Sequence, residues 1–188
     1  TDITNDIGLI KTDFKNTNYL NINSSGAEIG EDIVAFGYPL SEKLSSSVKL
    51  TRGIVSSLSG PGNNYSLIQI DAAIQPGNSG GPVMNYNSQV VGIASAGLRK
   101  VKMLVEEEYI PENVNFAVSA ATLSNFLKAN DVNIGSEENK VASTKQLAQI
   151  GIPATVQLYC LNTIAAHKQN KENERYGDVM LEKVIDLR

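Results

Sequence analysis

One short segment of the sequence carries the residue types of a nucleophilic serine site. Residues 77–82 read Gly-Asn-Ser-Gly-Gly-Pro, which surrounds Ser79 with glycines. A serine hydroxyl attacks a carbonyl carbon only when a base removes its proton and fixed donors receive the developing oxyanion. The glycines allow a tight turn with room for a substrate, so the N–H groups of Gly77 and Ser79 are candidates for an oxyanion hole. The alternative is a glycine-rich hairpin turn without any chemistry.

The surroundings of Ser79 resemble a known enzyme family. Residues 71–82, Asp-Ala-Ala-Ile-Gln-Pro-Gly-Asn-Ser-Gly-Gly-Pro, closely resemble the serine motif of the HtrA/DegP-like bacterial branch of the trypsin-like (chymotrypsin-fold) serine proteases. Segments similar to that family's strands follow in the family's order at residues 34–39, 51–56, 91–95 and 115–118. The resemblance covers residues 5–128. It implies the second β-barrel of the two-barrel fold, and a serine-type endopeptidase that forms an acyl-enzyme on Ser79.

The same resemblance suggests a role for Asp6. Residues 5–11, Asn-Asp-Ile-Gly-Leu-Ile-Lys, are similar to the family segment that supplies the aspartate of the catalytic triad. That carboxylate holds the histidine in the productive tautomer and stabilises its cation. The alternative is that Asp6 merely caps or solvates this part of the chain.

The histidine of such a triad does not precede Asp6, where the family order His, Asp, Ser places it. The single histidine, His167, follows the serine in a polar, helix-prone run, and we interpret it as a surface residue. The sequence begins with neither Met nor a signal-peptide pattern. We therefore expect a fragment or processed chain whose histidine lies upstream, and which is inactive by itself. The competing hypothesis is a non-catalytic protease-like module that binds extended peptides.

By resemblance, three stretches form the pocket for P1, the substrate residue whose carbonyl is attacked. They supply Ala73 and Ile74, then Ser95, Ala96 and Gly97, and finally Val114. Ala73 stands where a trypsin has an acid, so a basic P1 side chain would be buried without a partner. We therefore expect a preference for small or medium apolar P1 residues. The alternative is that these residues are simply part of the barrel core.

The elements that must position these residues are mostly short strands divided by turns, the pattern of an antiparallel barrel. After an apolar run at residues 7–11 and an Asn-rich linker, we predict strands at residues 33–39, 50–58, 66–70, 82–84, 89–94 and 114–118. Apolar periodicity predicts a helix over residues 121–129 that closes the barrel. The mainly β chain then divides into residues 1–15, a remnant of the first barrel with Asp6, residues 16–130, the second barrel with Ser79, and residues 131–188, an α/β extension.

Within the extension, an exposed linker is predicted at residues 136–140. A short helix follows at residues 144–149, ended by Gly151 and Pro153. A strand is predicted at residues 155–161 and a helix-prone polar run at residues 163–175. Cys160 is expected to be a buried strand residue, and as a lone cysteine it cannot form an internal disulfide.

Composition limits the classes of partner. With 41% hydrophobic and 19% charged residues the 188-residue chain is a folded protein, and its net charge of −4 with scattered Lys and Arg disfavours nucleic acid. Without a long apolar run we expect no membrane span, and without metal-ligand spacing no metal or cofactor. The expected partner is an extended polypeptide substrate, and the resemblance implies a periplasmic or secreted location. Apolar surface left uncovered along the Ser79 cleft predicts self-association, such as a homodimer.

Overall fold

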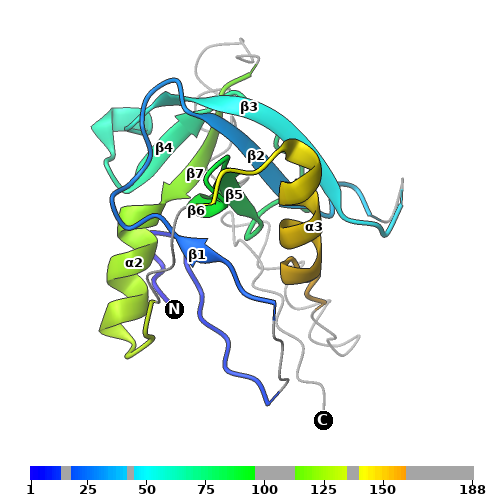
Figure 1. Ribbon diagram of the computed structural model, residues 1–188. Helices are drawn as coiled ribbons and strands as arrows, with labels where there is room; N and C mark the ends of the chain where they lie inside the picture. Colours follow the sequence, from blue (N-terminus) through cyan, green and yellow to red (C-terminus); the bar gives the residue numbers. More distant parts are fainter. Residues whose placement is uncertain (14–17, 42–44, 96–112, 135–139, 160–188) are drawn as a thin grey trace, which may run out of the picture. The chain divides into compact units, whose positions relative to one another are not determined.

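The computed structural model describes residues 1–13, 18–41, 45–95, 113–134 and 140–159. Residues 1–155 form one compact unit, and residues 156–159, which have no regular secondary structure, belong to a second unit. The elements of the first unit, in chain order (Figure 1), are β1 (Asn21–Ile22), β2 (Asp32–Gly37), β3 (Lys49–Ser57), the 3-10 helix η1 (Pro61–Asn63), β4 (Leu67–Ile70), β5 (Pro82–Asn85), β6 (Gln89–Ser95), β7 (Asn115–Ser119), α2 (Ala120–Ala129) and α3 (Thr144–Ala154).

Six of the strands close into an antiparallel barrel. Neighbouring strands follow the order β6, β5, β2, β3, β4 and β7, and β7 pairs with β6 to complete the circle. All pairings within this circle are antiparallel. Closure removes the unpaired edges that an open sheet would expose. The predicted fold class, mainly β with an antiparallel barrel and a closing helix, is confirmed.

β1 lies in the segment that the sequence predicted only as a linker. Asn21 and Ile22 pair in parallel with Gln89 and Val90 at the start of β6. The second half of the same β6 edge pairs with β7. A strand of two residues has no periodicity that a sequence can show, so only the fold reveals it.

β2 is buried on both faces, and its alternate side chains belong to two different cores. Ile33 and Ala35 join a cluster that receives residues from all six barrel strands and fills the barrel interior. Val34 and Phe36 belong to a second cluster, which includes Leu147 of α3. Successive strand side chains point to opposite faces, so β2 needs a cover outside the barrel, and α3 provides it. Burying a side chain of this size stabilises the fold by about 1.5–3 kcal/mol.

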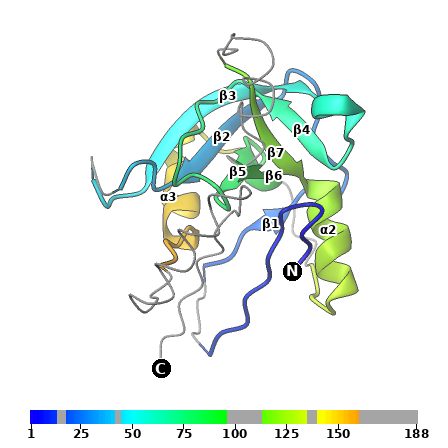
Figure 2. The same cartoon turned by 180° about the vertical axis from the view of Figure 1, so that it is seen from behind.

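α2 confirms the predicted closing helix and begins one residue earlier than expected. The Ser119 hydroxyl oxygen accepts a hydrogen bond from the Thr122 N–H at 3.2 Å. This N-cap satisfies one of the N–H groups that lack an intrahelical partner in the first turn. The Leu123 side chain is buried in the second cluster, which also contains Val34 and Phe36. α2 and α3 lie on opposite sides of the barrel in both views (Figures 1 and 2).

α3 starts where predicted, with a capping box between Ser143 and Gln146. Its predicted end at residue 149, before Gly151 and Pro153, is wrong, because the helix continues to Ala154. Gly151 does not terminate the helix but allows it to approach the barrel. A Cβ at this position would lie 2.6 Å from the Phe36 ring, so no larger residue fits. Pro153 lies inside the last turn, where it lacks the N–H that would otherwise donate to the carbonyl four residues earlier.

The predicted strand at residues 155–161 is not present in the described residues. Thr155 is the C-cap of α3, and residues 156–159 form no strand. The remaining two residues of that prediction, including Cys160, lie outside the described residues, as do residues 163–175. Residues 140–155 of the predicted extension belong to the same compact unit as the barrel.

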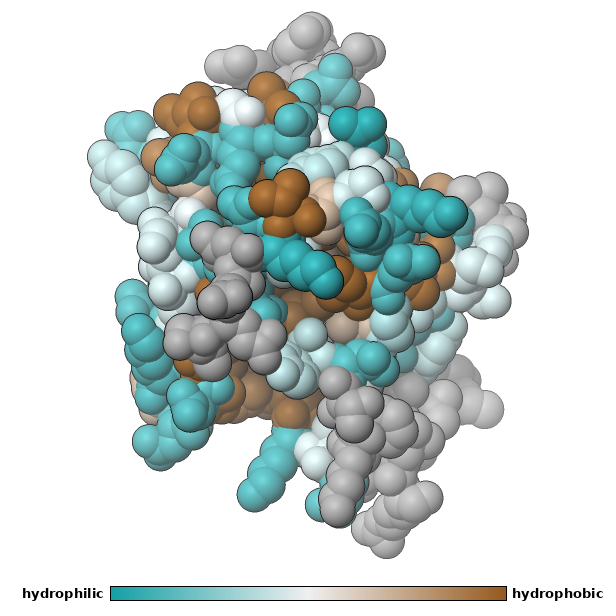
Figure 3. All heavy atoms as spheres, viewed as in Figure 1, coloured by the Kyte–Doolittle hydropathy of each residue, from teal (hydrophilic) through white to brown (hydrophobic). Residues whose placement is uncertain are grey.

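The surface seen in Figure 3 mixes hydrophilic and apolar side chains over the barrel and its two helices. Leu9 and Ile10, in the apolar run near the start of the chain, are 41% and 39% exposed. None of the helices in the described residues is long and apolar enough to cross a membrane.

Candidate active site

Ser79 lies on the second of two consecutive tight turns between β4 and β5. In the first turn, the Asn78 N–H donates to the Gln75 carbonyl at 2.9 Å. In the second, the Gly81 N–H donates to the Asn78 carbonyl, also at 2.9 Å. Ser79 is the second residue of that turn and is exposed, whereas Asn78 beside it is buried. The two turns therefore place Ser79 at the surface of the barrel, where it is exposed to solvent.

Glycines occupy the third position of both turns. Gly77 has φ +102° and Gly80 has φ +83°. A positive φ at this position is the requirement of a type II turn, and the proline at the second position of the first turn, Pro76, is typical of the same turn type. A Cβ on Gly77 would also collide with the Tyr38 carbonyl. The local sequence thus favours both turns before any tertiary contact forms.

The end of β2 holds one side of these turns. The Tyr38 N–H donates to the Gly77 carbonyl at 3.0 Å, and the Leu40 N–H donates to the Pro76 carbonyl at 3.0 Å. A peptide group is planar and trans, so its N–H points opposite to its carbonyl. The N–H of Gly77, which shares a peptide with the Pro76 carbonyl, therefore points away from Leu40. The bonds to Tyr38 and Leu40, in the segment directly after β2, fix the direction of this candidate oxyanion donor.

The other side of the turns is held by β6. The Gly80 N–H donates to the Ala94 carbonyl at 2.9 Å, and the Ala94 N–H donates to the Gly81 carbonyl at 2.9 Å. Ser79 is the neighbour of Gly80, so its position is fixed relative to the carboxyl end of β6.

Asp6 is presented by a turn at the start of the chain. The N–H groups of Asp2 and Ile7 donate to each other's carbonyls at 2.7 and 3.0 Å, and Asp6 within this turn has φ +54°. The Asn5 side-chain amide and backbone N–H both donate to the Asp2 carboxylate, and these hydrogen bonds lower the pKa of Asp2 from its ordinary value. Ile7 is buried, whereas Asp6 is exposed. The turn is anchored through Ile7 and offers the Asp6 carboxylate at the surface.

A serine at the end of β6 binds that carboxylate. The Ser95 hydroxyl donates to Oδ2 of Asp6 at 3.2 Å, although the two residues are far apart in the sequence. Ser95 directly follows Ala94, which holds the Ser79 turn. The structure therefore attaches Asp6, and the turn that carries Ser79, to the last two residues of one strand.

The predicted pocket residues that the structure describes lie at neighbouring ends of β4 and β7. Asn115 pairs with Ile70 in the sheet, and its side-chain amide donates to the Ala72 carbonyl at 2.9 Å. This bond ties the segment that carries Ala73 to the start of β7, directly after Val114. Ala73 is exposed and Val114 half-buried. Ile74, by contrast, packs into the barrel interior, in agreement with the alternative interpretation as core.

Two predicted pocket residues and the single histidine also lie outside the described residues. They are Ala96 and Gly97, predicted for the pocket, and His167.

Sequence reasoning missed what Ser95 contacts. It placed Ser95 in the pocket wall, whereas in the structure the hydroxyl binds Asp6 and the side chain is buried. The available signal was a hydroxyl at the end of the apolar run Val-Val-Gly-Ile-Ala, since a buried polar group needs a hydrogen-bond partner. Nothing in the sequence indicates that this partner is Asp6.

Comparison with known proteins agrees with this architecture. Residues 1–93 match the family described as trypsin-like peptidase domain. The chain is 35% identical over 161 residues to the uncharacterized protein y4bJ of Sinorhizobium fredii (strain NBRC 101917 / NGR234), which covers 85% of this chain and 25% of that protein.

Two further relatives have names that state an activity. The serine protease Do-like HtrA of Bacillus subtilis (strain 168) is 40% identical over 103 residues, covering 50% of this chain and 21% of the relative. A probable periplasmic serine endoprotease, DegP-like, of Pseudomonas putida (strain W619) is 41% identical over 99 residues, covering 50% of this chain and 20% of the relative. The chain thus spans a quarter or less of the length of these three proteins. With a closed six-stranded barrel and this pattern of relatives, the chain has a trypsin-like fold and is similar to the HtrA/DegP-like branch of the trypsin-like serine proteases.

Proposed function

We propose that this barrel is the serine-bearing part of an endopeptidase in which Ser79 is the nucleophile and Asp6 orients the catalytic base. The observation that carries the proposal is the hydrogen bond from Ser95 to Asp6. It brings the candidate aspartate to the same strand end that holds the turn of Ser79. A plain glycine-rich hairpin would not require a carboxylate to be held beside it.

The reaction follows from the roles of these groups. Oγ of Ser79 attacks the carbonyl carbon of the scissile peptide bond while a histidine takes its proton, and the N–H groups of Gly77 and Ser79 bind the oxyanion. The histidine returns the proton to the leaving amine, which leaves an acyl-enzyme. Water then attacks the ester carbonyl while the histidine takes its proton. The histidine returns that proton to Oγ of Ser79 as the acid product leaves. Asp6 stabilises the histidine cation throughout.

The histidine of this mechanism comes, in our proposal, from outside residues 1–188, because His167 follows the serine in an order that the family does not use. We expect residues 1–188 alone to hydrolyse an unstructured protein substrate such as casein no faster than their Ser79→Ala variant. Without the base, only the weak contribution of the oxyanion donors and of substrate binding remains. Release of labelled casein peptides measures both rates. A turnover that depends on Ser79 and is abolished by His167→Ala would contradict the proposed source of the base.

The pocket is proposed to accept small or medium apolar P1 residues, with Ala73 and Val114 on its walls. Replacement Ala73→Asp in the full-length protein is expected to raise the use of Arg and Lys at P1, relative to Ala, by about tenfold or more, since a charge-assisted hydrogen bond contributes about 1.5–3 kcal/mol. Ratios of kcat/KM for matched peptides measure this change. Ala73→Asn is the control of similar size without the charge. An equal change of the kcat/KM ratio in both variants, or no change in Ala73→Asp, would show that the P1 side chain does not bind beside residue 73.

The location and partners remain part of the proposal. A relative is named as a periplasmic endoprotease, which supports a periplasmic or secreted location and an extended polypeptide as the substrate. The exposed Leu9 and Ile10, next to the Asp6 turn, support the prediction of self-association as a homodimer. If Ser79 has no reactivity, the alternative, a non-catalytic protease-like module that binds extended peptides, is favoured.

A further inference from the structure

α3 contacts the same strand end that holds the oxyanion turn. The main chain of Tyr38 donates to the Gly77 carbonyl at 3.0 Å. The side chain of the same residue reaches in another direction, and its hydroxyl donates to the Thr155 carbonyl at 3.1 Å. Thr155 is the C-cap of α3. One residue therefore joins the end of this helix to the turn that carries the candidate oxyanion donor.

The helix end at this contact is itself well fixed. Thr155 is buried, and its hydroxyl donates to the Gly151 carbonyl at 2.7 Å. Gly151 packs directly against the ring of Phe36, a β2 residue two positions before Tyr38. Leu147, one turn earlier, is fully buried. Movement of this end of α3 would have to move the end of β2, since closely packed cores transmit displacement.

We propose that Tyr38 is a positioning residue through which α3 sets the geometry of the Gly77–Ser79 turn. The inference rests on the proposed function, because it concerns the donor side of that site. An oxyanion donor acts only when it is held at hydrogen-bond distance from the position of the developing charge. The Gly77 N–H keeps its direction through the bonds of its neighbours to Tyr38 and Leu40. The hydrogen bond from the Tyr38 hydroxyl to the C-cap of α3 restricts the motion of Tyr38, and with it the motion of the Gly77 N–H.

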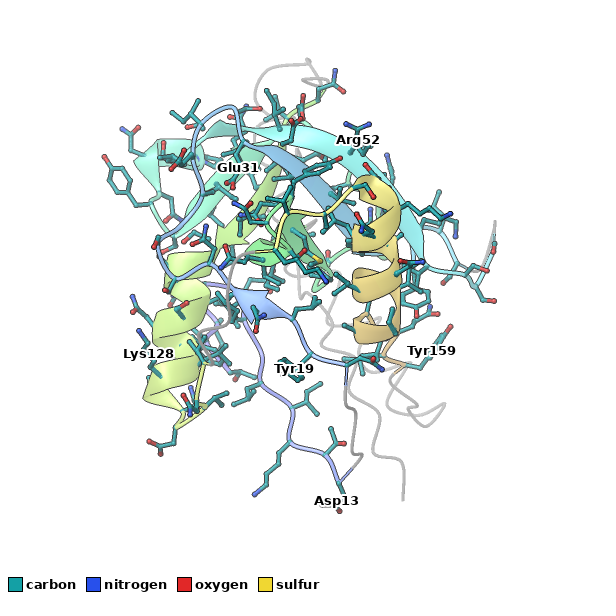
Figure 4. All side chains as sticks on the ribbon, viewed as in Figure 1. Asp13, Tyr19, Glu31, Arg52, Lys128 and Tyr159 are labelled. Atoms are coloured by element: carbon teal, nitrogen blue, oxygen red, sulfur yellow. The ribbon has the colours of Figure 1, made fainter. Side chains whose placement is uncertain are left out.

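A second hydrogen bond at the opposite end of α3 provides a matched control. The hydroxyl groups of Tyr86 and Thr144, the first residue of the helix, are 2.8 Å apart. Tyr86 lies in the β5–β6 turn, where the Arg52 guanidinium is 5.9 Å from its ring centre. Figure 4 shows Arg52 on β3 near this end of the helix. Tyr38→Phe and Tyr86→Phe therefore each remove one half-buried hydroxyl bound to α3, but only the first touches the serine turn.

The test compares these two variants with the unchanged full-length protein by amide hydrogen exchange and thermal unfolding. Both should lower Tm by a similar small amount. Only Tyr38→Phe should speed exchange of the amides of residues 77–81, by about fivefold, which corresponds to the loss of a hydrogen bond of about 1 kcal/mol. It should also slow labelling of Ser79 by a fluorophosphonate about fivefold, whereas Tyr86→Phe leaves that rate unchanged.

Equal effects of the two variants on the amide exchange of residues 77–81, or no effect of Tyr38→Phe, would overturn the coupling. A change of Tm in Tyr38→Phe without local exchange or labelling changes would show a merely structural contact and would overturn it too. If the unchanged protein is not labelled at Ser79 at all, the proposed function fails. The exchange comparison needs no catalysis and still decides whether α3 acts on the turn.

Discussion

Alanine in place of Ser79 is expected to abolish covalent labelling of the full-length protein by a fluorophosphonate. The hydroxyl oxygen is the atom that attacks phosphorus in the probe and carbon in the peptide, so nothing else at this site can substitute for it. Hydrolysis of a peptide substrate should fall by about 10⁶-fold, as expected when a member of a Ser-His-Asp unit is removed. Mass spectrometry of the labelled protein identifies the modified residue.

The control is Ser47→Ala, which removes an exposed loop serine and should leave labelling unchanged. Labelling of Ser79→Ala at full extent would show that another residue is the nucleophile. Loss of labelling in both variants would instead indicate damaged folding, which circular dichroism would detect.

The second large effect is expected for Asp6→Asn. The amide keeps the size of the carboxylate but cannot stabilise the histidine cation, and it can hold the ring in the wrong tautomer. A decrease of about 10⁴-fold in kcat with little change in KM is expected for such a change. Separate determination of kcat and KM on one peptide substrate, with Tm measured in parallel, tests it.

Ser95→Ala gives the matched comparison for that prediction. It removes the hydroxyl that binds Oδ2 of Asp6 but leaves the charge in place. A smaller decrease of about tenfold to a hundredfold is expected, because a hydrogen bond to a charged group contributes about 1.5–3 kcal/mol. If Asp6→Asn loses less activity than Ser95→Ala, Asp6 does not have the triad role.

The relation to y4bJ bears on the place of α3 in this protein. The 15% of the chain outside that match is shorter than the segment after α3, so α3 lies within the matched region. The trypsin-like family match, by contrast, ends at residue 93. The similarity to y4bJ therefore extends beyond the barrel and includes the sequence of α3.

The sequence alone was sufficient for the barrel strands, the closing helix and the turn of Ser79. These features depend on local patterns: alternating apolar residues, an N-cap at Ser119, and the Pro-Gly and Ser-Gly pairs that favour type II turns. The Asp6 role came from resemblance, since a single aspartate near an apolar run has no local signature. The contacts between Ser95 and Asp6 remained invisible because a sequence does not state which distant segments meet.

Tertiary packing decided the extent of α3 and the function of its glycine. By local rules Gly151 and Pro153 end a helix, but burial of Leu147 and the close approach of Gly151 to Phe36 outweigh those preferences. The same packing removes the predicted strand at residue 155, whose threonine caps the helix instead. Local propensity amounts to about 1 kcal/mol for a glycine, whereas the buried contacts of one core side chain amount to about 1.5–3 kcal/mol. Where the two conflict, burial determines the structure.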